Sequence, residues 1–421
     1  MPQVLSPRAC GIDFGTSNST VGYLRPGQPT LLPLEDGKVT LPSVVFFNAE
    51  DESTRFGRAG LADYLAGHEG RLMRSLKSLL GSRLIDGKTE VHGHSLLFSD
   101  LLKQFIGDLK RRADLQGGKN FEQVVIGRPV YFVDDDPVAD RAAEATLAEI
   151  AHAIGFKDVS FQYEPIAAAF HYEMEIQREE MVLVVDIGGG TSDFSLVRLS
   201  PQRAKIADRQ SDLLASGGVH VGGTDFDRLL SLASVMPILG YRGQLKNKRE
   251  MPSGIFFNLA TWHTINFAYT RHVLNEQKNL AIDALDPKKM NRLLALIKQR
   301  DGHWLANEVE QAKITLSDHE VALLQLDRLE EGLSQTISRA EFDAATEPLV
   351  DKVETTVAAM LRDAGVSAVG IDTVFFTGGS SGIPRLRQRI AALLPQARSV
   401  EGDLFGSIGA GLAVDAARRY G

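Results

Sequence analysis

Two segments of this 421-residue chain share one pattern, and this repetition constrains the fold more than any other feature. Residues 9–24 read ACGIDFGTSNSTVGYL, and residues 182–197 read VLVVDIGGGTSDFSLV. In each, an apolar strand reaches an aspartate, a turn rich in Gly, Ser and Thr follows, and a second strand leaves, which predicts a β-hairpin with a polar tip. The aspartates, Asp13 and Asp186, lie 173 positions apart. That spacing is too long for a solenoid repeat and indicates two lobes built on related units.

The tip of each hairpin carries groups that bind phosphate. Glycines let the backbone approach an anion closely, while successive N–H groups point at it. Thr16, Ser17 and Thr191 add hydroxyl donors at these tips. A strand-end aspartate suits Mg²⁺, which keeps several waters and uses one or two carboxylates beside substrate phosphates. One glycine-rich turn is common in plain β-structure, but two matched copies favour a phosphate site.

Two further glycine clusters resemble strand-to-helix connections. Residues 216–227 read SGGVHVGGTDFD, where Thr224 or Asp225 is expected to cap a helix that continues through Phe226. Residues 373–384 read TVFFTGGSSGIP, which predicts a buried strand, a glycine turn and a helix over 385–394. Bare backbone at such a turn can accept a base or ribose, and a plain β-to-α connection is the alternative.

Composition excludes several classes of protein. The chain has 46 Lys and Arg against 54 Asp and Glu, a net charge of −8, which speaks against a general nucleic-acid binder. A single cysteine, Cys10, excludes an internal disulfide framework and is typical of a reducing compartment. Residues 1–8 lack the apolar core of a secretory signal, and no run of about 18 apolar residues occurs. We therefore expect a cytoplasmic protein with no membrane contact.

In their order along the chain, the four clusters resemble the nucleotide-binding core of the actin, sugar-kinase and heat-shock ATPase superfamily. The resemblance implies an α/β, actin-like ATPase (ribonuclease H-like) fold, with two lobes that each hold a mixed sheet flanked by helices. The nucleotide would lie in the central cleft. Lobe I is expected over residues 1–180 plus 401–421, with an insertion at about 36–114. Lobe II is expected over 181–400, with an insertion at about 228–339.

Residues 125–129, 161–165 and 377–380 most resemble the shorter, YegD-type branch of the seventy-kilodalton heat-shock chaperones, the DnaK family. Five further segments are similar to the DnaK family in general. They are RSLKSLLG at 74–81, GRPVYF at 127–132, YEPIAAA at 163–169, EQAKITLS at 310–317 and DLFGSIGAG at 403–411. By this resemblance Lys77 orients the attacking water and the γ-phosphate, and Pro129 couples nucleotide state to lobe geometry. Asp13, Asp186 and Glu164 would hold Mg²⁺ through water.

The resemblance also implies a full set of site residues. The catalytic residues would be Lys77, Glu164, Thr191 and Asp193. The nucleotide would be ATP or ADP with Mg²⁺, bound by Gly15, Thr16, Ser17, Asn18, Gly188, Gly189, Gly190, Thr191, Gly222, Gly223, Glu310, Lys313, Ser317, Gly378, Gly379, Ser380 and Asp403.

Helical spacing gives independent expectations for two of these regions. Glu310, Lys313 and Ser317 fall on one helical face, where they could hold ribose hydroxyls and adenine, and a surface Glu–Lys pair is the alternative. Lys77 is expected on an amphipathic helix, on which a solvated lysine is the usual case. The apolar residues of that helix would be Leu72, Leu76, Leu79 and Leu80.

Three departures from the family pattern affect the expected function. Gly382 stands where the chaperones carry an adenine-stacking arginine, so we expect weak base discrimination unless Arg385 substitutes. The segment 236–303 is longer and different, so the family's exchange factors need not bind. The chain ends at Gly421, directly after the closing helix, which leads us to expect no peptide-binding domain.

The function predicted from the sequence is therefore a slow Mg²⁺-dependent ATPase of the heat-shock type, acting as a molecular chaperone. An unfolded or specific client protein and a nucleotide-exchange partner are the expected partners, with no nucleic acid and no membrane. A nucleotide-dependent scaffold or sensor is the first alternative, and a small-molecule kinase of the same superfamily is the second.

Overall fold

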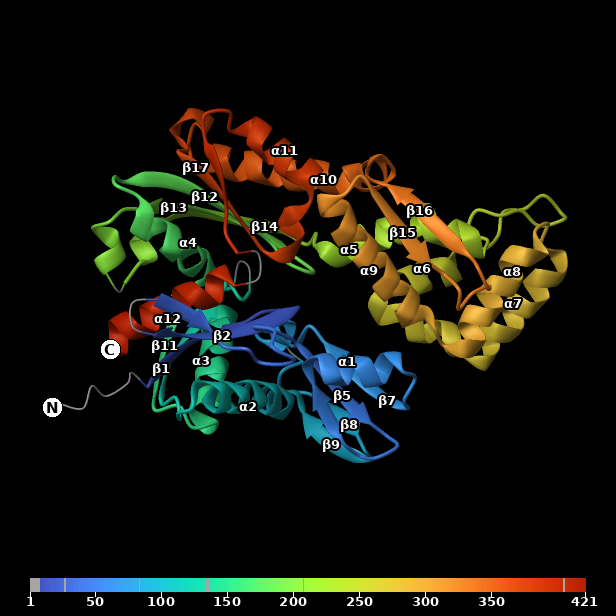
Figure 1. The fold of residues 1–421 in the computed structure, drawn as a ribbon, viewed down its shortest axis with the longest axis horizontal. Coiled ribbons are helices and arrows are strands. Elements are labelled where there is room, and N and C mark those ends of the chain that lie inside the picture. Colours follow the sequence, from blue (N-terminus) through green and yellow to red (C-terminus); the bar gives the residue numbers. More distant parts are fainter. Residues whose placement is uncertain (1–7, 26–27, 83, 134–135, 207, 404–405) are drawn as a thin grey trace.

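The structure, a computed structural model, describes residues 8–25, 28–82, 84–133, 136–206, 208–403 and 406–421. The first seven residues, which belong to the stretch without a secretory signal, lie outside the described residues. Figure 1 shows two halves, one above the other, with helices α4 (Glu164–Glu175) and α12 (Ser407–Tyr420) between their sheets. In the described part of the chain, no helix combines the length and apolarity needed to cross a membrane.

The first hairpin forms as predicted and organises a six-stranded mixed sheet. Strand β1 (Ala9–Phe14) is buried throughout and pairs antiparallel with β2 (Asn18–Arg25) and parallel with β10 (Gln123–Arg128). The sheet is completed by β3 (Gln28–Leu31), β4 (Thr40–Pro42) and β11 (Asp158–Tyr163). Helices α2 (Phe98–Gly117) and α3 (Pro137–Ala153) share one buried core with Ile12 and Phe14.

The second hairpin organises a five-stranded sheet of matching topology. Strand β12 (Glu180–Ile187) pairs antiparallel with β13 (Ser192–Leu199) and parallel with β17 (Thr373–Thr377). The outer strands are β14 (Leu213–Val219) and β18 (Arg398–Glu401). The strand order β3-β2-β1-β10-β11 thus corresponds to β14-β13-β12-β17-β18. This correspondence confirms that the repeated motif marks two related mixed sheets.

Helices α4 and α12 pack against both sheets. Their side chains Ala168, Phe170 and Leu412 share a buried core with Val125 of the first sheet and Val184 of the second. At the first sheet, α12 lies so close to β1 that a Cβ on Gly11 would stand 2.3 Å from the Leu412 backbone. A movement of one sheet relative to the other would therefore change its packing against these two helices.

Each half is extended to the right in Figure 1 by one group of smaller elements. The first group contains β5 (Val44–Asn48), β6 (Thr54–Phe56), α1 (Gly57–Leu65), β7 (Gly70–Arg74), β8 (Lys88–Val91) and β9 (His94–Leu97). The second contains α5 (Gly223–Leu230), α6 (Gly254–Ala260), α7 (Arg271–Asp283), α8 (Pro287–Gln299), α9 (Gly302–Asp318), β15 (Val321–Gln325) and β16 (Ser334–Ser338). Between α6 and α7 runs the 3-10 helix η6 (Trp262–Tyr269).

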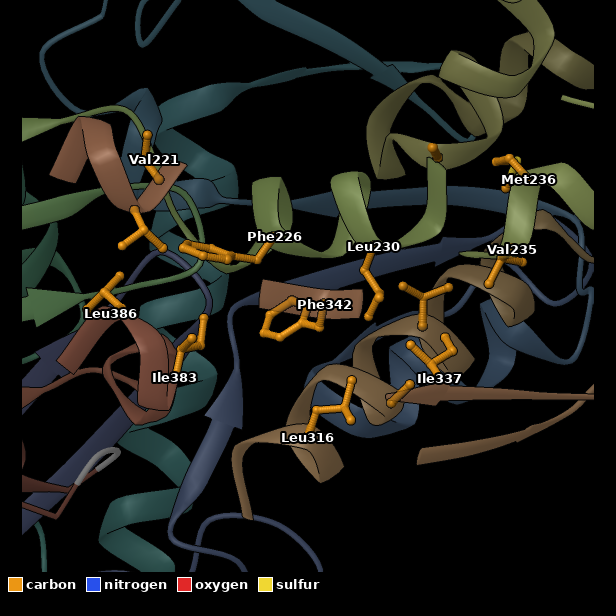
Figure 2. Close-up of a cluster of buried hydrophobic side chains, with 14 of the residues drawn as sticks. Val221, Phe226, Leu230, Val235, Met236, Leu316, Ile337, Phe342, Ile383 and Leu386 are labelled. Carbon is orange, nitrogen blue, oxygen red and sulfur yellow. The ribbon is translucent and has the colours of Figure 1, made fainter. Parts of the chain in front are cut away.

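The third and fourth glycine clusters are anchored in one apolar core. Helices α10 (Arg339–Asp363) and α11 (Pro384–Leu393) contribute to it. Figure 2 shows Val221, Phe226 and Ile383 close to Phe342, and the Phe226 and Phe342 ring centroids are 6.3 Å apart. This packing fixes the two glycine turns relative to each other.

Candidate functional site

The first hairpin tip lies between Phe14 and Asn18 and is held from outside by a serine. The Ser43 N–H donates to the Ser17 carbonyl at 2.8 Å, and the Ser43 hydroxyl donates to the Gly15 carbonyl at 2.7 Å. Ser43 is buried. The sequence analysis missed it because no motif surrounds it.

The third glycine cluster holds the second hairpin tip. The N–H and the hydroxyl of Thr224 donate to the Gly189 carbonyl at 2.8 and 2.9 Å, and the Gly223 N–H donates to the Gly188 carbonyl at 3.0 Å. The helix entry is as predicted, and of the two expected caps Asp225 takes part in the cap while Thr224 does not. Gly222 is the N-cap residue, and the Asp225 carboxylate accepts from its N–H at 3.1 Å. Thr224 does not cap because its hydroxyl is engaged by the hairpin tip.

The two tips meet. A Cβ on Gly189 would stand 2.0 Å from the Ser17 hydroxyl. Within the described residues, the N–H groups of Thr16, Ser17 and Gly189 donate to no protein acceptor. Backbone donors gathered at glycine-rich turns without acceptors suit a phosphate group. The sequence motif thus has the free donors that its predicted chemistry requires.

A cluster of acids with one lysine lies beside the tips. The Lys77 ammonium is 2.5 Å from Glu164 Oε1, and both side chains are largely buried. Burial and the nearby Glu164 carboxylate raise the pKa of Asp13 to about 7. Burial, Asp193 and Glu164 raise the pKa of Asp186 to about 8. Burial lowers the pKa of Lys77, but Glu164 and Asp13 outweigh it, so the net shift is upward and Lys77 stays charged.

The local structure around Lys77 differs from the prediction. Leu72 belongs to strand β7, and Lys77 lies on a single 3-10 turn, η1 (Leu76–Leu79), rather than on an amphipathic helix. Ser75 adopts a left-handed conformation with φ of 56° and separates the strand from the turn. The apolar spacing was misleading because Leu76 and Leu80 are buried by this turn and not by a helix face.

The donor set fits a hydrated cation better than a directly bound one. Among the described residues, no group of three or more His, Cys, Asp or Glu side chains is arranged to hold a metal ion. The Glu164 carboxylate nevertheless raises the pKa of both Asp13 and Asp186, and Asp13 also raises the pKa of Asp186, which places these carboxylates near one another. Mg²⁺ commonly keeps several waters, so carboxylates that contact only those waters are compatible with it.

A cavity of about 860 Å³ brings all four predicted catalytic residues together. Its lining includes Thr16, Lys77, Pro129, Glu164, Asp186, Thr191 and Asp193. The Thr191 hydroxyl donates to Asp193 Oδ2 at 3.0 Å, which orients both side chains from one strand end. The lining thus combines hydroxyls, carboxylates and one ammonium.

Two further predicted residues, Ser380 and Lys313, meet at Gly223. A Cβ there would lie 2.5 Å from the Ser380 hydroxyl and 3.2 Å from the Lys313 ammonium. Lys313 also forms a buried ion pair with Asp227 at 2.9 Å, a partner that the sequence analysis missed. The feature of the sequence that could have indicated Asp227 is its position one helical turn after Gly223.

Four other predicted residues are placed as follows. Glu310 and Ser317 lie on α9 with Lys313, as the helical spacing predicted, and the Ser317 hydroxyl donates to the Lys313 carbonyl at 3.4 Å. Gly378 has φ of 79°, and a Cβ there would stand 2.3 Å from Asp186 Oδ1, so this turn contacts the acid cluster. Asp403 lies between β18 and α12 and does not line the cavity.

Arg385, the suggested substitute for the stacking arginine, is held elsewhere. Its guanidinium makes a bidentate pair with Glu347 of α10 at 2.8 and 3.0 Å. Gly382 ends a 3-10 turn, η8 (Gly379–Gly382), and adds no side chain. Neither position 382 nor Arg385 therefore offers a guanidinium to the fourth turn, whose Ser381 carbonyl instead accepts from Arg387 Nε at 2.5 Å.

Two glycine variants should separate folding from binding. In Gly222→Ala the new Cβ would stand 2.4 Å from the Gly190 nitrogen, so we expect a loss of about 1–3 kcal/mol in the free energy of unfolding. In Gly190→Ala nothing lies within 4 Å of the new Cβ. That variant should keep its stability and lose nucleotide affinity. Thermal unfolding with and without Mg·ATP checks both, and equal stability of the two variants would contradict the packing.

Two sheets of matched topology, with glycine-rich hairpin tips facing each other at a cavity, define a two-lobed α/β protein of the actin-like ATPase fold. A family model described as Hsp70 protein matches residues 9–235 and 286–417, most of the chain. The chain belongs to the Hsp70 family. Residues 236–285 fall outside the match, in the segment that the sequence identified as divergent.

Individual relatives are similar at a lower level. The chain is 26% identical over 429 residues to a protein named Chaperone protein HscA homolog from Shewanella putrefaciens, and 26% identical over 430 residues to another of that name from Shewanella sp. strain MR-4. Each alignment covers 97% of this chain and 58% of the relative. The chain thus spans little more than half the length of these relatives. Its placement in the YegD-type branch stays a prediction.

Proposed function

We propose that this protein binds ATP and ADP with Mg²⁺ between its two sheets, hydrolyses ATP slowly and uses the nucleotide state to control a chaperone-type interaction with a client protein. The observation that carries the proposal is the meeting of the two hairpin tips, with unused N–H donors, beside the Lys77 and carboxylate cluster. We take the lobe boundaries predicted from the sequence as part of this proposal.

In the proposed site, the chain's own groups bind the phosphates, orient water and neutralise phosphate charge. The N–H groups and hydroxyls of Thr16 and Ser17 would hold phosphate oxygens from one side, and the Gly189 N–H and the Thr191 hydroxyl would hold them from the other. Lys77 would leave Glu164 to stabilise the reacting phosphoryl group, while Asp193, to which the Thr191 hydroxyl donates before nucleotide binds, would be released to orient water. Such positioning and charge neutralisation are the main requirements of phosphoryl transfer, so no covalent nucleophile is needed.

The carboxylates of Asp13, Glu164 and Asp186 would hold the waters of Mg²⁺. When bound, the ion neutralises phosphate charge. On the nucleoside side, Lys313 and Glu310 would face the ribose, next to the bare backbone of Gly223 and Gly379.

The proposed output is a change in lobe geometry. Both sheets pack on α4 and α12, and α4 begins with Glu164 of the acid cluster. Pro129 lines the same cavity as Lys77, which supports its proposed role in coupling nucleotide state to the lobes. A client and an exchange partner would read the resulting population of open and closed forms.

Nucleotide binding is testable by thermal unfolding. At 100 times Kd, Mg·ATP should stabilise the chain by about 2.7 kcal/mol, because a ligand that binds only the folded state adds RT ln(1 + [L]/Kd). GTP should give a similar shift, since neither Gly382 nor the engaged Arg385 offers a stacking group. Tight binding of ATP alone would contradict weak base discrimination. No shift with any nucleotide would contradict the proposed function.

Hydrolysis assays separate the proposed function from its alternatives. Release of free phosphate without any acceptor favours an ATPase over a small-molecule kinase. An unfolded polypeptide that changes the hydrolysis rate, together with suppression of aggregation, favours a chaperone. The absence of both effects favours a nucleotide-dependent scaffold or sensor.

A further inference from the structure

One end of the second half differs in charge from the rest of the chain. Residues 240–300 contain 11 Lys and Arg against 4 Asp and Glu, whereas the remaining residues contain 35 against 50. Figure 1 shows α7 and α8, which belong to this stretch, at the far right, away from both large sheets. Most of the stretch, residues 240–285, falls outside the Hsp70 family match. The positive charge therefore belongs to a part of the chain that the family model does not describe.

A tight turn over residues 244–250 is fixed against the segment between α7 and α8. The Lys246 N–H donates to the Asp283 carbonyl at 2.7 Å. Leu245 and Ala284 form an isolated β-bridge, and both are buried. Because backbone hydrogen bonds and buried side chains hold the turn, the surface above it is formed before any partner binds. A preformed surface lowers the entropic cost of binding.

Two aliphatic side chains are exposed beside this turn. Ile282 is 69% exposed and Leu285 is 58% exposed. The Lys246 ammonium donates to the Ile282 carbonyl at 2.6 Å, which places a cation next to the aliphatic pair. Lys248 and Arg249 are exposed on the turn itself. We call these five residues the basic tip.

The three cations of the basic tip form no ion pair within the described part of the chain. Of the acids at this end, Asp286 is engaged at the start of α8, where it accepts from the N–H groups of Lys288 and Lys289 at 3.1 and 3.3 Å. Glu250 and Asp283 are the exposed acids beside the tip. The ammonium and guanidinium groups of the tip are thus available to carboxylates from outside the chain.

We propose that the basic tip is a docking surface for an acidic segment of a partner protein, with apolar side chains of that segment covering Ile282 and Leu285. Carboxylates of the segment would pair with the three cations. Exposed ion pairs contribute little by themselves, so burial of the aliphatic pair would supply much of the affinity.

The charge of the remaining chain favours a short protein segment over a larger anionic surface. A long nucleic acid or a membrane that reached the tip would also approach parts of the chain whose net charge is negative. A short acidic segment can stay within the tip. The proposal does not rest on nucleotide binding, because no residue of the basic tip lines the cavity at Lys77.

The test measures binding of a labelled peptide rich in Glu and Leu by fluorescence anisotropy. Lys248→Gln/Arg249→Gln should weaken binding about fivefold at low salt, and less at high salt, because exposed ion pairs are weak and screened. Ile282→Ser/Leu285→Ser should weaken binding about tenfold at every salt concentration. Peptides with Gln in place of Glu, or Ser in place of Leu, should bind the unsubstituted chain more weakly than the parent peptide.

Exposed residues away from the basic tip provide matched controls. Lys103→Gln/Lys352→Gln removes two exposed cations, one on α2 and one on α10. Leu115→Ser/Val369→Ser removes two exposed aliphatic side chains. Both control variants should bind the peptide as the unsubstituted chain does. The Tm of each variant is measured first, and binding is compared below the lowest Tm, which separates loss of binding from unfolding.

Two kinds of result would overturn the proposal. The first is no binding of the acidic peptide to the unsubstituted chain, or equal binding by the tip variants and the control variants. The second is tighter binding of a single-stranded RNA, or of vesicles that contain phosphatidylserine, with loss of that binding in the tip variants. The basic tip would then be a surface for polyanions or lipids and not for a protein segment.

Discussion

Replacement of Lys77 by alanine is expected to slow single-turnover ATP hydrolysis by about 10²–10³-fold, the effect of removing one preorganised charge-stabilising group. Lys77 is the cation within the acid cluster: it pairs with Glu164 at 2.5 Å, and its charge favours ionisation of Asp13 and Asp186. Its removal should therefore weaken stabilisation of the transferring phosphoryl group more than ground-state binding. Rapid-quench measurement of phosphate release, with Mg·ATP affinity measured in parallel, checks both effects.

The matched control for this prediction is Lys103→Ala. Lys103 is exposed on α2 and forms no ion pair within the described residues. The Lys103→Ala variant should hydrolyse ATP at the rate of the unsubstituted chain. Because Lys77→Ala leaves Glu164 buried without its cation, its unfolding temperature must be measured as well, and hydrolysis compared only below it. Hydrolysis by folded Lys77→Ala at the unsubstituted rate would show that Lys77 has no catalytic role.

Asp186→Asn should stabilise the nucleotide-free protein at high pH while removing its stabilisation by Mg·ATP. The pKa of Asp186 is raised from 3.8 to about 8 by burial and by Asp193, Glu164 and Asp13. The folded state therefore holds a proton that the unfolded state releases, so this group's contribution to stability is present below about pH 4 and is lost as pH rises to about 8. At a shift of this size the loss reaches up to about 6 kcal/mol.

Asparagine avoids that loss because it carries no charge at any pH. The difference in the free energy of unfolding between Asp186→Asn and the unsubstituted chain should grow from about pH 4 to about pH 8 and then remain constant. Denaturant unfolding across this range measures it, with Asp363→Asn, exposed on α10, as the control that should show no such growth. A difference that shrinks with rising pH would contradict the raised pKa.

Local sequence predicted the parts of the fold that depend on short-range chemistry. Both hairpins, the strand before Gly378 and the helix with Glu310 and Lys313 form where the alternation and spacing placed them. They could be predicted because a buried strand and a glycine turn each have a short, recognisable pattern. The prediction of a helix at Lys77 was wrong because such a short pattern can fit more than one structure. Leucine spacing over a few residues fits a helix and a buried 3-10 turn equally well.

The sequence could not identify residues whose role depends on distant partners. Ser43 and Trp262 lie in no motif, and Asp227 and Arg74 lie at the ends of motifs that do not predict their partners. Each of these residues contacts a group at least 26 positions away. The cap proposed at Thr224 failed similarly, since the carbonyl that accepts from Thr224 belongs to the second hairpin. Local propensity has no access to such contacts.

The sequence by itself determined that the chain has two related glycine-turn hairpins on mixed sheets, because glycine turns and strand-end aspartates are local features with local physics. Only the tertiary structure decided that the two tips touch, that one lysine neutralises several carboxylates, and that the halves are joined by an arginine stacked on a tryptophan. These depend on helix packing between the sheets and on burial, which raises the pKa of acids that would otherwise be ordinary.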